Sequence, residues 1–189
     1  MESKPSLLLH VCCAPCSTTA IERLKETYDL TGFFYNPNIH PAEERTAREQ
    51  EFSRLLTTWN IPAITGAGDG SEWFEATAGM EEDKEGGPRC LVCYRLRLEA
   101  TAAEAAKRGI SHFATTLTIS PQKNATVINA IGTQAGQKFS VTYLTSNFKK
   151  QNGFGRSVEL SHEHGLYRQN YCGCLYSQRD SLLREKKEN

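Results

Sequence analysis

Short apolar runs alternate with longer amphipathic runs along the chain. Residues 7–11 (LLLHV) are an apolar run bounded by turn residues, which predicts a buried strand. Similar runs predict further strands at 29–36, 61–66, 112–117 and 138–144. Helical patterns lie between and after these runs. The first predicts a helix to about Thr27 that is capped by Ser17. The others predict helices from Pro41 to Trp59, over 73–78, from Cys90 to Gly109, from Asn124 to Ala135, over 157–164 and after Cys174.

The alternation of strands and helices predicts an α/β fold, a three-layer arrangement of one parallel sheet with helices on both faces. In such folds the functional crevice lies at the C-terminal ends of the strands. Cys12, Cys13 and Cys16 follow the first strand, 36–40 the second and 118–123 the fourth, so a cysteine-rich site is expected at that edge. We expect one domain over 1–189, with a core at about 7–177 and a charged tail at 181–189.

The overall composition is that of an ordinary globular protein. Hydrophobic residues make up 39% of the 189 residues and charged residues 23%, which is typical of a globular domain. No run approaches the roughly 20 apolar residues that span a bilayer, so a cytoplasmic protein without membrane contact is expected. The 22 basic and 22 acidic residues cancel, which excludes a global attraction to nucleic acid. Any such contact requires a local patch, and bases concentrate in the C-terminal third (FKKQNGFGR, LYRQ).

All seven cysteines lie in three groups, CCAPC, CLVC and CGC. A cytoplasmic compartment disfavours structural disulfides, so metal binding or redox chemistry is expected. Cys90 and Cys93 lie three apart at a helix start, on roughly one face, where thiolates are favoured. Cys12 and Cys13 could complete a four-thiolate site, because the proline that follows directs the chain out of the strand. The spacing allows zinc or an iron–sulfur cluster, and modestly favours the cluster.

The remaining thiols have more than one interpretation. Cys172 and Cys174 flank a glycine that lets the chain fold sharply, so they could form a strained, reducible disulfide or supply two further metal ligands. Cys16 could bind a second metal or simply pack at the helix start. His40, after the second strand, is a candidate for the crevice. His162 and His164 lie two apart on a predicted helix and cannot easily share one metal.

Five motifs occur in order between about residues 7 and 177: HVCCAPC, YNPNIHP, RCLVCYRLRL, TTLTISPQKN and FGRSVELSHEHGLYRQNYCGC. With them the sequence strongly resembles the QueH-type, cobalamin-independent epoxyqueuosine reductases. The resemblance implies a fold related to the adenine-nucleotide α-hydrolases of the HUP and PP-loop group. It also implies reductive removal of the epoxide oxygen from epoxyqueuosine in tRNA, the last step of queuosine biosynthesis, with electrons from an external donor.

The resemblance further implies a [4Fe–4S] cluster and a probable second iron ion beside it. The implied cluster ligands are Cys12, Cys13, Cys90 and Cys93. Cys172 and Cys174 would be a redox-active pair or ligands of the second metal, and Cys16 is a possible ligand of that metal. The family often has acidic residues where this chain has Asn147 and Asn170. Tyr35 or Tyr94 is a candidate proton donor, with core packing as the simpler explanation of both.

ATP is not predicted as a substrate. Relatives with the same strand–turn–helix bind ATP through a Gly/Ser-rich loop whose backbone N–H groups hold phosphate, whereas CCAPCS has no glycine. For the same reason an ATP-dependent tRNA thiolase, which would need a loop such as S-G-G-x-D-S, is a weak alternative. The main alternative is a zinc-stabilised, non-redox tRNA-binding module of the same fold. The sequence indicates no oligomeric state.

Recognition of tRNA is expected to combine phosphate contacts with stacking on an exposed base. The candidate contacts are Lys149, Lys150, Arg156, Arg168, Arg89 and His40, with Phe154, Tyr167 and Tyr171 among them. A solvated basic loop would have much the same composition, so this expectation concerns the group more than any one residue.

Overall fold

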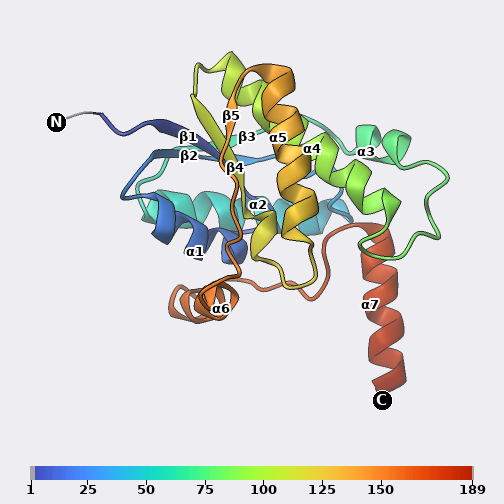
Figure 1. Cartoon of the computed structure of the whole chain (residues 1–189). Coiled ribbons are helices and arrows are strands. Elements are labelled where there is room, and N and C mark those ends of the chain that lie inside the picture. Colours follow the sequence, from blue (N-terminus) through green and yellow to red (C-terminus); the bar gives the residue numbers. More distant parts are fainter. Residues whose placement is uncertain (1–2, 189) are drawn as a thin grey trace.

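The computed structural model describes residues 3–188, and within them five parallel strands form one sheet (Figure 1). The strands are β1 (Ser6–His10), β2 (Asp29–Phe34), β3 (Ala63–Thr65), β4 (His112–Thr115) and β5 (Thr142–Tyr143). Their order across the sheet is β3-β2-β1-β4-β5. Leu8 in the central strand β1 is in register with Thr31 of β2 and with Phe113 of β4. The carboxyl ends of β1, β2 and β4 therefore meet at one edge, as predicted.

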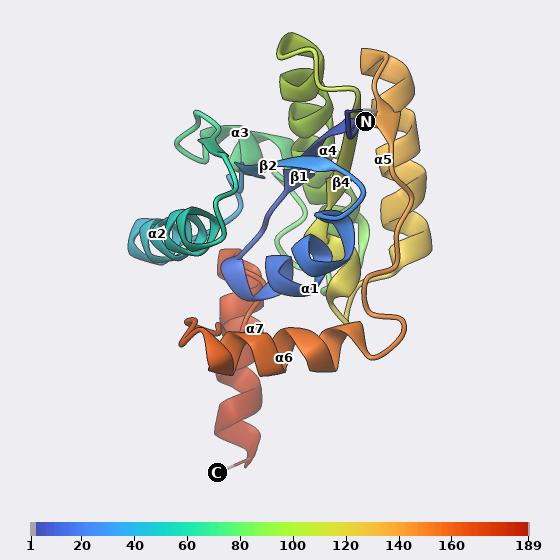
Figure 2. The same cartoon turned by 90° about the vertical axis from the view of Figure 1, so that its left-hand side faces the viewer.

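Helices cover both faces of this sheet (Figures 1 and 2). α1 (Ala14–Leu24), α2 (Ala42–Thr58) and α6 (Gly153–Glu163) lie on one side, and α4 (Pro88–Lys107) and α5 (Ala125–Phe139) lie on the other. The short helix α3 (Ser71–Ala76) packs beside α4, and a 3₁₀ turn, Thr116–Ile119, follows β4. The predicted three-layer α/β architecture is confirmed.

Strand β1 shows how the sequence builds two hydrophobic cores. Successive side chains of a strand point to opposite faces of the sheet. Leu7 and Leu9 therefore pack with Ile21 of α1 and Phe52 of α2, whereas Leu8 packs into the layer formed by α4 and α5. All three leucines are buried. The apolar run thus explains why β1 is the buried central strand and why helices pack on both faces of it.

Several predicted boundaries differ from the structure, and two of them show the physical reason. Helix α1 begins at Ala14, and the residue that precedes it is Cys13 in an extended conformation, so Ser17 is not the cap. The Ser17 hydroxyl instead donates a hydrogen bond to the Ala14 carbonyl at 2.7 Å, inside the helix. The strand predicted over 138–144 is reduced to the two residues of β5, because α5 continues to Phe139.

The last helix, α7 (Leu175–Glu188), projects from the body of the molecule (Figures 1 and 2). It contains most of the stretch predicted as a charged tail. Residues 1, 2 and 189, which fall within the predicted domain bounds, lie outside the described residues. Across residues 3–188, no helix combines the length and apolar character needed to cross a membrane.

Candidate metal centre and active-site cleft

Three thiols meet where β1 ends and α1 begins. The sulfur atoms of Cys12, Cys13 and Cys16 all lie within 4.8 Å of one another, and the Sγ atoms of Cys12 and Cys13 are 3.9 Å apart. Cys13 has φ −166° and ψ 155°, and Pro15 lies at the start of the helix. The chain therefore leaves the strand after His10 and turns so that neighbouring thiols converge, instead of pointing to opposite faces as they would in a continuing strand.

Hydrogen bonds within this triad distribute its charge unevenly. Hydrogen bonding with Cys13 and Cys16 holds the pKa of Cys12 well below the usual value of a thiol. The same bond to Cys12 raises the pKa of Cys13 to about 12. The hydroxyl of Thr116 accepts the Cys12 backbone N–H at 3.3 Å and lies 3.5 Å from the Cys12 sulfur. The triad thus stabilises one thiolate, the form in which cysteine binds metal.

The other thiols form a second group around a small cavity of about 20 Å³. Cys90 and Cys93 come from the N-terminal part of α4, and Cys172 and Cys174 come from the segment before α7. All seven cysteines are free thiols. The structure therefore joins Cys12 and Cys13 with Cys16, and it joins the C-x-x-C pair with the C-G-C pair. The assignment of particular thiols to a cluster, a second metal or a redox pair stays a prediction.

A larger cleft of about 460 Å³ opens beside both groups. Cys12, Cys16 and Cys172 contribute to its lining, and Cys172 also lines the small cavity. One wall is the segment after β4, including Thr116 and Lys123. The opposite wall comes from α6 and the segment that follows it. A ligand in this cleft can therefore reach thiols from both groups.

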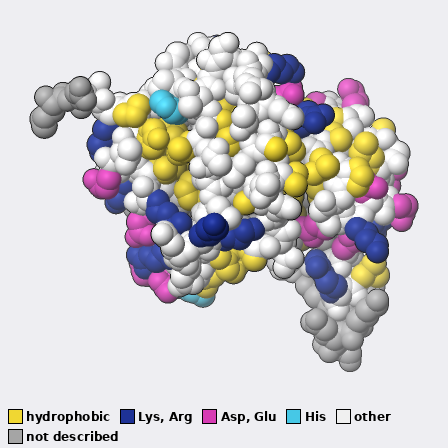
Figure 3. All heavy atoms as spheres, in the orientation of Figure 1, with side chains coloured by type: hydrophobic (Ala, Val, Ile, Leu, Met, Phe, Trp, Pro, Cys, Tyr) yellow, Lys and Arg dark blue, Asp and Glu magenta, His cyan; other side chains and the backbone are white. Residues whose placement is uncertain are grey.

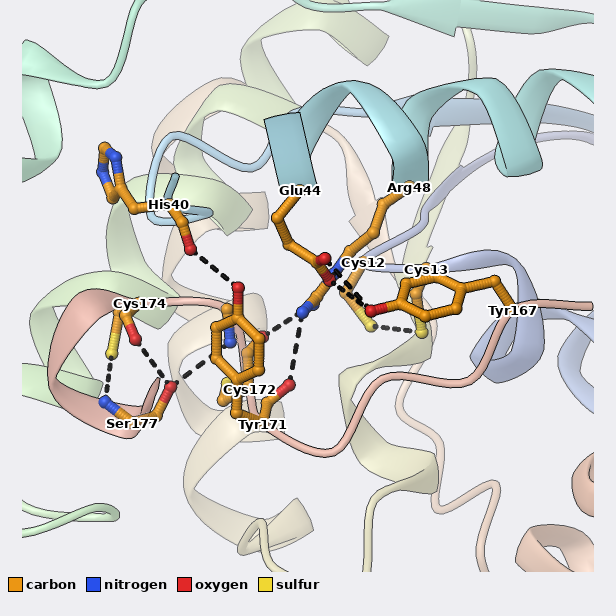
Figure 4. A network of polar contacts seen from close by, with 11 residues as sticks. Cys12, Cys13, His40, Glu44, Arg48, Tyr167, Tyr171, Cys172, Cys174 and Ser177 are labelled. Carbon is orange, nitrogen blue, oxygen red and sulfur yellow. Dashed lines mark hydrogen bonds and ion pairs between the residues drawn. The ribbon is translucent and has the colours of Figure 1, made fainter. Parts of the chain in front are cut away.

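Residues 167–174, here called the strap, carry Cys172 and Cys174 and are bound to the start of α2 (Figure 4). Arg48 is buried and donates to the Cys172 carbonyl at 3.0 Å and to the Tyr171 carbonyl at 3.3 Å. Its Nε also donates to Glu44 at 2.6 Å, and Tyr167 donates to the other oxygen of Glu44 at 3.1 Å. These contacts fix the strap from a helix that is far away in sequence.

The strap is also held at its glycine. Gly173 has φ +130°, which favours glycine, and a Cβ there would lie 3.0 Å from Ile39. The Gly173 carbonyl accepts the His40 backbone N–H at 2.8 Å, and the His40 carbonyl accepts the Tyr171 hydroxyl at 2.8 Å. His40 therefore contributes its backbone to the site, and its ring lies against Trp73 and Phe74.

Cationic side chains lie beside the thiols. Arg97 follows Cys93 by one helical turn, is buried, and donates from Nε to the Cys93 carbonyl at 3.3 Å. Burial acts to lower the pKa of Arg97, yet negative charge at Cys93 and Cys172 outweighs it and raises that pKa above its usual value. The pKa of Lys123 is raised in the same way, chiefly by Cys172 against the effect of burial. This electrostatic environment favours an anionic group at the thiols.

Unsatisfied buried donors indicate the same charge preference. Arg97 Nη2, Trp73 Nε1, and Nε and Nη2 of Arg89 have no hydrogen-bond partner among the described residues. All three side chains line the small cavity with the second group of thiols. Thiolates bound to a metal are anionic, and hydrogen bonds to such sulfurs are a usual feature of iron–sulfur sites. The residues present therefore fit a thiolate-bound metal centre.

The predicted tRNA contacts lie in different surroundings. Arg168 lines the cleft. Lys150 is exposed, and dark-blue side chains gather on the face of Figure 3 over the segment between β5 and α6. Lys149 donates to the carbonyls of Ser120 and Lys123, so it holds one cleft wall.

The other two predicted contacts are already engaged within the protein. Arg156 forms an ion pair with Glu22 at 3.0 Å. Arg89 is buried, and its Nη1 donates to the Met80 carbonyl at 2.8 Å. Its guanidinium also lies over the ring of Tyr176. A phosphate contact by Arg89 would therefore require it to leave these partners.

The candidate proton donors do not face the cleft. Tyr35 donates to Glu72 at 3.0 Å, and burial together with that carboxylate raises the pKa of Tyr35 to about 12. Tyr94 is buried and lines only the small cavity. Of the two asparagines noted in the sequence, Asn170 lines the cleft and Asn147 does not.

Sequence reasoning missed the cations Arg48, Arg97 and Lys123. A charged residue inside a helical run is usually assigned to the solvent side. One signal was available for Arg97, because the spacing of four from Cys93 places both on one helix face. Lys123 lies in the loop after the fourth strand, which is part of the predicted crevice.

The fold is shared with solved structures of low sequence identity. A U34-tRNA thiolase, NcsA from Methanococcus maripaludis with its [4Fe–4S] cluster, matches with a TM-score of 0.59 and 13% identity over 99% of this chain and 67% of that chain. A predicted subunit of tRNA methyltransferase from Methanocaldococcus jannaschii matches with a TM-score of 0.54 and 17% identity over 83% of this chain and 75% of that chain. The predicted three-layer α/β fold with a cysteine-rich edge is thereby confirmed.

Sequence comparison then gives the family. The sequence model of the family described as epoxyqueuosine reductase QueH matches residues 7–180. Proteins of that name are 42% identical in Streptococcus pyogenes serotype M1, over 92% of this chain and 71% of the relative, and 39% identical in Thermotoga maritima, over 91% and 90%. A third, from Acinetobacter baylyi, is 41% identical over 95% of this chain and 84% of the relative. The chain belongs to the QueH family of epoxyqueuosine reductases, which are oxidoreductases, and the resemblance seen in its motifs is confirmed.

Proposed function

We propose that this protein reduces the epoxide of epoxyqueuosine in tRNA to the alkene of queuosine. The reaction consumes two electrons and two protons, breaks both C–O bonds of the epoxide and releases the oxygen as water. The proposal rests on one observation above all: in a member of this family, thiols from both groups line a single open cleft. The electrons come from an external donor, and a tRNA substrate makes the cytoplasm the expected compartment.

The proposed ligands of a [4Fe–4S] cluster are Cys12, Cys13, Cys90 and Cys93. A second iron is proposed to bind Cys16, Cys172 and Cys174. Alternatively, Cys172 and Cys174 form a redox pair. Cys16 and Cys172 line the cleft, which supports their place beside the substrate; Cys12 lines it as well, and Cys174 does not. An iron that meets the substrate must be accessible from the cleft. When bound, these groups would supply electrons one at a time and a Lewis acid for the epoxide oxygen.

The protein's own residues then prepare the cleft for this chemistry. Arg48 and Glu44 hold the strap, and with it the position of Cys172. Lys123 lines the cleft, and it keeps its proton because Cys172 and other nearby groups raise its pKa against the effect of burial. We infer that Lys123 stabilises the negative charge that develops on the departing oxygen. ATP has no part in this scheme, because thiols stand where a phosphate-binding loop would.

The metal and sulfide content of the protein tests this proposal. The protein is purified without oxygen, reconstituted with iron and sulfide, and assayed for iron, zinc and acid-labile sulfide per chain. About four sulfides with four or five irons, and a broad absorbance that bleaches on reduction, are expected. Zinc without sulfide, even after reconstitution, would overturn the reductase mechanism and leave a zinc-stabilised binding module.

A further inference from the structure

Two planar groups lie together in the wall of the cleft that α6 and the strap form. Phe154, in the first turn of α6, is 38% exposed, and the guanidinium of Arg168 lies 5.8 Å from the centre of its ring. Arg168 is held there because its Nη1 donates to the Ser161 hydroxyl at 3.1 Å. Aromatic rings and guanidinium planes are the surfaces on which proteins stack unpaired bases of RNA.

The next residue, Gln169, brings a hydrogen-bond acceptor to the same wall. It lines the cleft, and its buried Oε1 has no hydrogen-bond partner among the described residues. A buried acceptor without a donor is unfavourable, so a ligand that supplies an N–H group gains affinity by pairing with it. A guanine-type base has such donors, the N1–H and the exocyclic amino group, in the plane of the ring.

The depth of the cleft gives this base an orientation. Cys12, Cys16 and Cys172 line the same cleft as Phe154 and Gln169. In epoxyqueuosine the epoxide is on a cyclopentane ring attached through position 7 of a 7-deazaguanine, on the side away from N1 and the amino group. A base whose N1–H side meets Gln169 therefore directs its epoxide-bearing arm away from that wall and into the remaining space of the cleft.

We propose that Phe154, Arg168 and Gln169 form a nucleobase subsite that takes the 7-deazaguanine base of the substrate nucleotide. Phe154 and Arg168 stack on the base, and Gln169 Oε1 accepts a hydrogen bond from its N1–H or amino group. This inference rests on the proposed function and deepens it, since it assigns the residues that recognise the base and not those that reduce the epoxide.

Binding of stem–loop RNAs tests the subsite without any turnover. The probes are a fluorescent stem–loop with one epoxyqueuosine nucleotide and the same stem–loop with an abasic nucleotide at that position. Gln169→Leu and Phe154→Leu are each expected to weaken binding of the modified loop about tenfold and to leave binding of the abasic loop unchanged. Gln169→Glu keeps an acceptor and is expected to bind the modified loop within about threefold of the wild-type protein.

The chain offers a matched control for each variant. Phe74, which is 40% exposed on α3, does not line the cleft, so Phe74→Leu is expected to bind both loops like the wild-type protein. Gln134→Leu on the exposed side of α5 is the control for the glutamine. Thermal unfolding of each variant checks that it is folded.

The outcomes separate the subsite from the proposed function. The subsite is overturned if Gln169→Leu and Phe154→Leu bind the modified loop as tightly as the wild-type protein does. It is also overturned if these variants lose as much affinity for the abasic loop as for the modified loop. Wild-type protein that binds both loops with the same affinity also overturns it. Turnover is measured separately by nucleoside mass, so a failed reductase assay with base-dependent binding would refute the reductase and leave the subsite in place.

Discussion

Arg48 on α2 donates a hydrogen bond to the carbonyl of Cys172, 124 positions later in the chain, at 3.0 Å. Burial acts to lower the pKa of Arg48, but electrostatic interaction with Cys13 and the hydrogen bond to Glu44 outweigh it and raise that pKa above its usual value. Arg48 thus lies between the N-terminal cysteines, Cys12 and Cys13, and the strap that carries Cys172 (Figure 4). The role of Arg48 in holding the strap follows from this position more than from its charge alone.

Replacement of Arg48 is expected to free the strap. Arg48→Met removes the bonds to the strap and leaves Glu44 without its buried partner, which should lower the free energy of unfolding by about 3 kcal/mol. Alkylation of Cys172 and Cys174 in the metal-free, reduced protein should become faster, as measured by iodoacetamide labelling and peptide mass spectrometry. Arg45→Met, on the same helix, is the control. An unchanged labelling rate in Arg48→Met would show that the strap is held by other contacts.

Gly173 is expected to tolerate no side chain. Gly173→Ala combines an unfavourable φ with close approach to Ile39 and Arg48, so we expect a loss of about 1–3 kcal/mol in the free energy of unfolding and a lower iron content after reconstitution. Gly79→Ala is the control, because Gly79 also has a positive φ beyond the left-handed helical region, +80°, but a Cβ there meets nothing within 4 Å. Urea unfolding and iron analysis of both variants measure the difference. Equal effects would assign the loss to backbone conformation alone.

Thr116 is expected to tune the metal centre through Cys12. Its hydroxyl accepts the Cys12 N–H, which leaves the hydroxyl hydrogen free to donate to the Cys12 sulfur. Hydrogen bonds to ligand sulfur stabilise the reduced, more negative state of a cluster. Thr116→Val should therefore make the reduction potential more negative, whereas Thr116→Ser should leave it nearly unchanged, in a spectroelectrochemical titration. Thr118→Val, which alters a hydroxyl paired with Ser146, is the control. A potential that is the same in Thr116→Val would exclude this hydrogen bond as a determinant.

Lys150 is expected to contact tRNA phosphate. It is exposed, whereas its neighbour Lys149 is engaged with the carbonyls of Ser120 and Lys123. Lys150→Ala should weaken tRNA binding and lower the slope of log affinity against log salt concentration by about 1. Filter binding at several salt concentrations measures both. A slope equal to that of the wild-type protein would remove Lys150 from the footprint. Lys149→Ala is a poorer test, because it also disturbs a wall of the cleft.

The sequence was sufficient to predict the sheet, its parallel strands and the edge at which the first thiols lie. The last strand was predicted too long because the whole apolar run at 138–144 was assigned to it, whereas α5 continues to Phe139. In the structure Gly132 and Gly136 lie inside α5, where a Cβ at Gly136 would be 2.6 Å from the Val141 carbonyl. They permit close packing of the helix on β5, a tertiary requirement that a local pattern does not reveal.

The sequence was sufficient to predict which thiols belong to the candidate site, but not how they are arranged in space. Motif order placed all seven cysteines in one functional context, and the CCAPC run already grouped Cys16 with Cys12, but nothing in the sequence grouped Cys93 with Cys174. The grouping of Cys93 with Cys174 depends on where the strap lies, and Arg48 helps to fix the strap. A buried arginine in an amphipathic helix is indistinguishable in sequence from a solvated one.

Conversion of epoxyqueuosine to queuosine is the measurement that tests the proposed reduction most directly. Reconstituted protein is incubated without oxygen with epoxyqueuosine-containing tRNA and a chemical reductant, and the digested nucleosides are separated by mass. The expected result is loss of one oxygen from the modified nucleoside, with two electrons consumed for each queuosine formed, and no conversion by Cys90→Ser protein. A fully reconstituted, reducible protein that binds this tRNA and leaves its epoxide intact would contradict the proposed function.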